Sequence, residues 1–173
     1  MNNRIAVRAL ALLLAAVAID AQATEAAPRT TATEAGATEK TASCILVSGS
    51  IAAVTRSEGE TTLVQGNVTG TLAGSLVGRI GPTSAHADGA LRAAVVDHLV
   101  MLDGAQLTTE DEVILTPVPR SPGVFHQRTT FNVVGGSGRF ANASGTFMSH
   151  GEADTTRGTV VSIYEGRICG VAQ

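Results

Sequence analysis

Two side chains with acid–base chemistry, His98 and Asp111, lie on either side of the dipeptide Asp103-Gly104. Asp-Gly is the favoured pair for a two-residue type I′ hairpin turn, in which both residues have positive φ. Such a turn pairs Val96 with Asp111 on two antiparallel strands and makes His98 a diagonal neighbour of Asp111. An imidazole beside a carboxylate can transfer protons or orient a ligand carbonyl. The sequence therefore predicts His98 and Asp111 as candidate catalytic residues.

The same turn decides which side chains share a face of the two strands. Period-two alternation gathers most aliphatic residues on one face, which we assign to the interior: Val96, Val100, Leu102, Leu107 and Val113. His98, Thr109 and Asp111 then point inward as well. The opposite face, expected in solvent, carries Asp97, Glu110 and Glu112. Two alternatives to catalysis stay open: a buried, hydrogen-bonded pair with a structural role, and a one-residue bulge that turns both side chains to solvent.

Other reactive side chains have less support from their spacing. His86, His126 and His150 are scattered singly along the chain, so the sequence predicts no metal site, and no motif predicts a cofactor. The acidic run at residues 110–112 alternates in direction along a strand, which argues against a shared cation site.

The elements that would position these residues are short strands. After Cys44, stretches of β-branched and aliphatic residues alternate with glycine and proline breaks, and no stretch has a 3.6-residue period. The pattern predicts an all-β chain with strands near residues 44–55, 60–71, 73–80, 89–102, 105–116, 124–134, 144–153 and 158–169. Strands at this spacing are typical of a sandwich or a closed barrel.

The composition supports an aliphatic core and excludes a nucleic-acid surface. Of the 173 residues, 44% are hydrophobic but only 3% are aromatic, and there is no Trp. Bulk disorder does not fit such a composition. The net charge is −3, and no basic cluster is present that could bind phosphates.

The N-terminus has the pattern of a secretory signal peptide. Arg4 and Arg8 flank the start of an apolar run over residues 9–19, which is too short to span a bilayer, and Ala21-Gln22-Ala23 matches an A-x-A cleavage site. We therefore expect a signal peptide over residues 1–23 and a secreted or periplasmic protein. Residues 24–42 are rich in Ala, Thr and Glu without apolar periodicity, which predicts a disordered, flexible leader before a folded domain over residues 43–173. No membrane-spanning segment is predicted.

The two cysteines, Cys44 and Cys169, lie in the first and last predicted strands. An oxidising compartment favours a disulfide between them. In a closed barrel the first and last strands pair with each other, which brings the two side chains within bridging range. Single cysteines without CxxC spacing argue against a redox or metal site.

A glycine-rich segment carries a family resemblance. Residues 133–147 read VVGGSGRFANASGTF, which resembles the GGTGRF-x-x-A-x-G segment of the allene oxide cyclase and dirigent superfamily. The pieces GNVTGTLAGSLVG and LDGAQLTTED resemble small secreted bacterial members of that group, and the closing YEGRICG suits its last strand. The resemblance covers residues 44–173 and implies a closed, eight-stranded antiparallel barrel with an apolar lumen.

Three functions are compatible with such a barrel. The first is binding of a small apolar molecule in the lumen, which the low aromatic content favours. The second is a cyclase or isomerase that uses His98 and Asp111, with Tyr164 as a third polar group. The third is a structural or interaction module with a packed lumen. The candidate ligand-binding residues are Val96, Val100, Thr109, Phe131 and Tyr164.

Overall fold

The computed structural model describes residues 43–172. The expected signal peptide, the expected leader and residue 173 lie outside the described residues. The described part of the chain consists of strands and two single-turn 3₁₀ segments: β1 (Cys44–Glu58), β2 (Thr61–Val68), η1 (Gly70–Leu72), β3 (Gly74–Ile80), β4 (Ser84–Ala85), β5 (Leu91–Met101), β6 (Gln106–Pro117), β7 (Val124–Ser137), η2 (Gly138–Phe140), β8 (Ser144–Asp154) and β9 (Thr159–Cys169). Within this part, no helix is long and apolar enough to cross a membrane.

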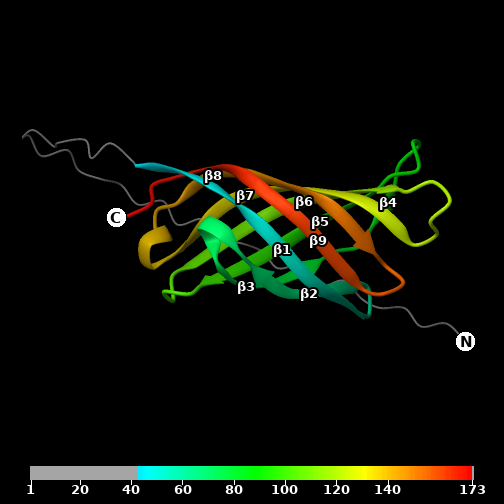
Figure 1. Cartoon of the computed structure of the whole chain (residues 1–173), viewed down its shortest axis with the longest axis horizontal. Helices are drawn as coiled ribbons and strands as arrows, with labels where there is room; N and C mark the ends of the chain where they lie inside the picture. Colours follow the sequence, from blue (N-terminus) through cyan, green and yellow to red (C-terminus); the bar gives the residue numbers. More distant parts are fainter. Residues whose placement is uncertain (1–42, 173) are drawn as a thin grey trace, which may run out of the picture. The chain divides into compact units, whose positions relative to one another are not determined.

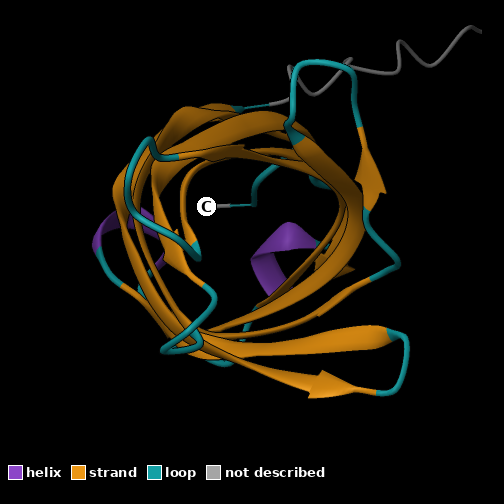
Figure 2. Ribbon diagram, turned by 90° about the vertical axis from the view of Figure 1, so that its right-hand side faces the viewer, coloured by secondary structure: helices purple, strands orange, loops and turns teal. Residues whose placement is uncertain are grey.

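Eight of these strands form one closed antiparallel barrel (Figure 1). Their order is β3-β2-β1-β9-β8-β7-β6-β5, and pairing of β3 with β5 closes the ring. Figure 2 looks along the barrel and shows the strands as a continuous ring. The short β4 pairs only with the start of β5. The expected eight-stranded barrel is confirmed, whereas β4 and the two 3₁₀ turns were not predicted.

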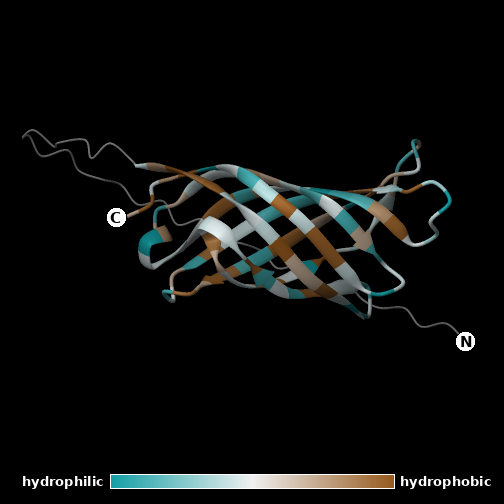
Figure 3. Ribbon diagram, viewed as in Figure 1, coloured by the Kyte–Doolittle hydropathy of each residue, from teal (hydrophilic) through white to brown (hydrophobic). Residues whose placement is uncertain are grey.

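Alternation of side chains builds the barrel wall. In β5 every second residue from Ala93 to Met101 is buried, and the residues between them are exposed. Buried and exposed positions therefore alternate in this strand, and Figure 3 shows polar and apolar residues interspersed along the strands. Closure of the sheet leaves no long unpaired edge, so residues 43–172 can bury a core without an α-helix among them.

One end of the barrel interior is packed solid. Phe131 and Phe147 stack with ring centroids 4.4 Å apart, and Phe147 meets Tyr164 edge-on at 5.8 Å. The Tyr164 hydroxyl donates to the carbonyl of Thr69 at 2.8 Å and accepts from the backbone N–H of Leu72 at 3.0 Å. Tyr164 is therefore a satisfied core residue at this closed end.

The glycine-rich segment closes the same end. Phe140 is fully buried and packs in the hydrophobic core. Arg139 lies over the Phe140 ring and forms an ion pair of 3.2 Å with Asp103 in the β5–β6 turn. Gly138 has a φ of +60°, which permits the turn that sends Phe140 inward. The segment thus has a structural role in the barrel.

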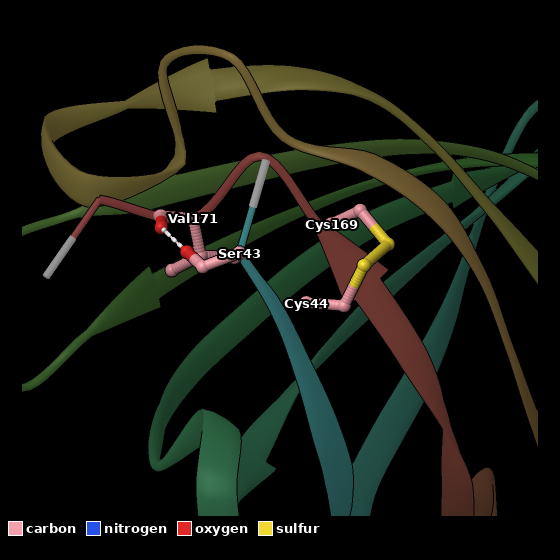
Figure 4. Close-up of a disulfide and its surroundings, with 4 residues drawn as sticks. All are labelled: Ser43, Cys44, Cys169 and Val171. Atoms are coloured by element: carbon pink, nitrogen blue, oxygen red, sulfur yellow. Dashed lines mark hydrogen bonds between the residues drawn. A yellow bond between two sulfur atoms is a disulfide. The ribbon is translucent and has the colours of Figure 1, made fainter. Parts of the chain in front are cut away.

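A disulfide joins Cys44 and Cys169 across the seam of the barrel (Figure 4). The two residues are direct register partners of β1 and β9, so the first and last strands of the domain are hydrogen-bonded neighbours. Just beyond the bridge, the Ser43 hydroxyl donates to the carbonyl of Val171. The predicted disulfide is confirmed, and it closes a loop of 125 residues.

Candidate functional site

The half of the barrel interior away from the disulfide is hollow. It holds a cavity of about 220 Å³, and Phe131 is one of the residues that line it. Aliphatic side chains from four strands make most of the wall: Ile51, Leu76, Ile80, Val95, Val113 and Leu115. Threonines near the strand ends surround the mouth: Thr55, Thr62, Thr83, Thr155 and Thr159. The cavity is therefore an apolar chamber with a polar rim.

The turn between β5 and β6 differs from the predicted two-residue turn. The Met101 N–H donates to the Ala105 carbonyl at 2.8 Å, and the Gly104 N–H donates to the Met101 carbonyl at 2.9 Å. Three residues therefore form the loop. Gly104 has a φ of +81°, but Asp103 is not among the residues with positive φ, which a type I′ turn requires. The predicted turn type is wrong, and the register of β5 changes by one residue.

The changed register reverses the faces of β5. Val96 and Val100 are exposed on the outer face, together with His98, whose Nδ1 lies 3.2 Å from the Thr108 hydroxyl. The expected inward positions of these three residues are wrong, and His98 does not meet Asp111. The physical reason is that β5 carries aliphatic residues on both faces, so turn length alone decides which face is buried.

The predicted inward face of β6 is confirmed, but the neighbour of Asp111 on β5 is Asp97 and not His98. Thr109 and Asp111 point inward. Asp97, which the sequence placed in solvent, also points inward, and its register partner is Thr109. Asp97 and Asp111 are therefore diagonal neighbours on the inner wall, where they form a carboxyl pair.

The two carboxyl groups differ in how they are satisfied. Asp111 accepts hydrogen bonds from the Thr109 hydroxyl at 2.8 Å and from the backbone N–H of Asn132 at 3.0 Å. The Oδ1 atom of Asp97 is buried and has no hydrogen-bond partner. Room for it exists because Gly78 faces it on β3, where a Cβ atom would stand only 1.7 Å from that oxygen. Asp97 also lines the cavity, whereas Asp111 lies behind it.

Burial makes both carboxyl groups weak acids. Desolvation raises the pKa of Asp97 to about 6, although a hydrogen bond with Asp111 opposes the shift. Desolvation also raises the pKa of Asp111 to about 8; the Thr109 hydroxyl opposes that shift and the charge of Asp97 adds to it. With these pKa values the pair holds about one proton at pH 7, because burial disfavours the charged forms and two adjacent carboxylates repel each other.

A second polar group lies in the cavity wall. The Gln127 amide nitrogen donates to the hydroxyls of Thr129 and Ser149, the second at 3.2 Å. The Gln127 Oε1 atom is buried without a partner. Two side chains of the wall, Gln127 on β7 and Asp97 on β5, thus each contain a buried acceptor oxygen without a partner.

The remaining predicted ligand-binding residues have different outcomes. Phe131 lines the cavity. Thr109 is inside the barrel, but its hydroxyl donates a hydrogen bond to Asp111 and it does not line the cavity. Tyr164 is inside too, but it lies in the closed end and does not line the cavity. The sequence analysis did not predict Asp97 or Gln127 as site residues. Gln127 could have been found, because it alternates with Thr129 and Phe131 and therefore shares the inward face of β7 with them.

The outer surface offers a less defined site. An open groove of about 990 Å³ runs beside β6, β7 and β8 and is lined by charges of both signs, including Arg128 and Glu152. His126 and His150 also border it. Among the described residues, no three His, Cys, Asp or Glu side chains are grouped so as to hold a metal ion.

The chamber is better defined, because it lies inside the barrel and two of its lining side chains contain a buried acceptor without a partner. Its chemistry has to be read from these residues themselves. Comparison of the chain with protein-family models, with curated proteins and with solved structures found no significant match.

Proposed function

We propose that this barrel binds a small, largely apolar molecule in the hollow half of its lumen. The observation that carries the proposal is the cavity itself, an apolar chamber of about 220 Å³ in a barrel whose other half is fully packed. A cavity of about 150 Å³ holds one benzene molecule, so by proportion this chamber of about 220 Å³ suits about nine non-hydrogen atoms.

The small side chains of the wall support binding over a structural role. Ala53, Ala153, Ser149 and Ser162 line the chamber at positions where larger residues would fill it. An empty cavity lowers stability by about 24 cal/mol per Å³, and unpartnered buried acceptors add to that cost. A packed structural barrel, the third function considered from the sequence, would avoid both costs.

Acid–base catalysis is a second candidate, and the Asp97–Asp111 pair is the observation that favours it. A carboxylic acid that keeps its proton near neutral pH can donate it to a bound substrate. A cyclase or isomerase of the allene oxide cyclase or dirigent type would then use this pair. His98, which points out of the barrel, and Tyr164, which is hydrogen-bonded to backbone in the closed end, would take no part. The family resemblance itself stays a prediction.

The disulfide supports a place of action outside the reducing cytosol. Disulfides form and persist in oxidising compartments, and the bond between Cys44 and Cys169 joins the ends of the domain. We therefore propose a secreted or periplasmic protein, in agreement with the signal pattern of residues 1–23.

Calorimetric titration with ethylbenzene, an uncharged molecule of suitable size, tests the binding function. Ala53 lines the chamber, while its neighbour Ala52 is exposed on the outer face of the same strand. We expect saturable binding that Ala53→Leu abolishes and Ala52→Leu preserves. Ala153→Leu provides a second filling variant if Ala53→Leu fails to fold. Absence of binding to the wild-type protein would reject the function.

A further inference from the structure

The chamber is lined by acidic side chains but by no basic side chain. Two of its lining residues are ionisable, Asp97 and Asp154, and no Lys, Arg or His lines it. Asp154 lies at the mouth, where its Oδ1 accepts hydrogen bonds from the backbone N–H groups of Thr156 and Arg157. The acid within the chamber is therefore Asp97, with Asp111 directly behind it.

Two of the residues that line the chamber contain a buried polar atom without a partner, and both atoms are of one kind. Asp97 Oδ1 and Gln127 Oε1 are both oxygen acceptors, and each belongs to a side chain more than nine-tenths buried. Arg92 Nε, the third unpartnered atom among the described residues, does not line the chamber. A ligand group that satisfies the Asp97 carboxylate must be a hydrogen-bond donor, because an ionised carboxylate only accepts.

We propose that the ligand of the chamber is a small apolar amine whose ammonium group binds the Asp97 carboxylate. The ammonium supplies N–H donors and the positive charge that the wall lacks. This inference rests on the proposed binding function and names the ligand class for it.

The groups around Asp97 are consistent with this assignment. On β3 it faces Gly78, which has no side chain, and on β6 it faces Thr109 and Asp111. On β7 the backbone N–H of Asn132 donates to Asp111 rather than to Asp97. No cation on these neighbouring strands neutralises the pair, so the positive charge must come from a proton or from a ligand.

Binding of an ammonium group then displaces the proton of the pair. The cation stabilises the ionised carboxylates, so the complex releases up to one proton when it forms near pH 7. An alkylamine has a pKa near 10, as lysine does, and stays charged throughout this range. Its affinity therefore rises between pH 6 and pH 8, by up to about tenfold per pH unit where one full proton is released.

Three probes with the same phenyl group test the inference: 2-phenylethylamine, 2-phenylethanol and phenylacetate. Isothermal titration at pH 8 should show the amine binding about tenfold or more tightly than the alcohol, with no measurable binding of phenylacetate. At pH 6 the preference for the amine should shrink. Phosphate and Tris differ in ionisation enthalpy, so the difference between the binding enthalpies measured in the two buffers at pH 7 gives the number of protons released. Binding of the amine should release protons, and binding of the alcohol should release none.

Two variants assign the effect to Asp97. Asp97→Asn should bind 2-phenylethanol as the wild type does, but lose the preference for the amine and its pH dependence. Glu110 is an acidic residue on the outer face of β6, so Glu110→Gln is the matched control. It should change neither the preference for the amine nor its pH dependence. Thermal unfolding shows whether both variants fold, and Asp97→Ala replaces Asp97→Asn if needed.

The outcomes separate the two claims. Equal or weaker binding of the amine relative to the alcohol would overturn the amine assignment and leave the apolar binding function in place. Failure of all three probes to bind the wild-type protein would overturn both. An amine preference that survives loss of the Asp97 carboxylate would overturn the assignment to this residue.

Discussion

Asp97 and Asp111 lie next to each other on neighbouring strands, with both carboxyl groups inside the barrel. The pair exists because the β5–β6 turn has three residues, which directs Asp97 rather than His98 inward. Its surroundings disfavour two charges, since the wall on this side is made of Gly78, Thr109 and aliphatic residues. The pair therefore links the protonation of the barrel interior to its stability.

Stability should fall as the pH rises from 5 to 8.5. In the unfolded chain both carboxyl groups lose their protons near pH 4, whereas burial raises the pKa of Asp97 to about 6 and that of Asp111 to about 8 in the folded protein. Unfolding in this window releases protons, so higher pH favours the unfolded state. Each pKa unit corresponds to about 1.4 kcal/mol, and we expect a loss of several kcal/mol in urea titrations.

The double variant Asp97→Asn with Asp111→Asn supplies the control for this pH effect. It lacks the two titrating groups, so its stability should change much less over the same range. It should also exceed the wild type in stability at pH 8.5, where the wild-type pair carries buried charge. A wild-type protein that gains stability from pH 5 to 8.5 would contradict the buried pair.

Neighbouring residues of β5 test the register directly. Leu99 is fully buried and His98 is exposed. Leu99→Ala should cost about 2–5 kcal/mol of unfolding free energy, while His98→Ala should change it by no more than about 0.5 kcal/mol. Chemical denaturation of the two variants measures both values. The reverse order would restore the two-residue turn and the inward position of His98.

The barrel and its seam could be predicted from the sequence, but the inner face of β5 could not. Periodicity and glycine breaks located the eight long strands, because burial of one face imposes alternation. In β5 this rule fails, since Val95 and Leu99 on one face match Val96 and Val100 on the other. The Asp-Gly pair suits both a two-residue and a three-residue loop, and this one-residue difference removed the predicted His98–Asp111 pair.

Gly78 provides space for the Asp97 carboxyl group, and this relationship is testable by a double-mutant cycle. A Cβ at residue 78 would stand 1.7 Å from Asp97 Oδ1, so Gly78→Ala must displace the side chain and should destabilise the protein by about 1–3 kcal/mol. Adding Asp97→Ala removes the clash. The double variant should therefore lose less stability than the sum of the single variants, with a coupling energy of about 0.5–3 kcal/mol. Additive losses would show that the two residues do not touch.

The disulfide should stabilise the barrel without being required for its fold. Cys44 and Cys169 close a loop of 125 residues, for which the chain-entropy model gives up to about 5 kcal/mol. The β1–β9 ladder holds the same seam by hydrogen bonds along its length. Replacing both cysteines by serine should lower Tm markedly in calorimetry, while the far-ultraviolet circular dichroism keeps its β-sheet form. Loss of that spectrum at 25 °C would contradict this account.

The location of a bound molecule tests the central claim most directly. Methyl groups of Ile51, Leu76 and Val113 line the chamber, whereas Leu72 and Leu107 are buried in the closed end. In methyl NMR spectra recorded during titration with ethylbenzene, the first set should shift saturably and the second set should stay nearly unchanged. Shifts confined to exposed residues such as Val161 and Ile163, or no saturable shifts, would contradict binding in the barrel lumen.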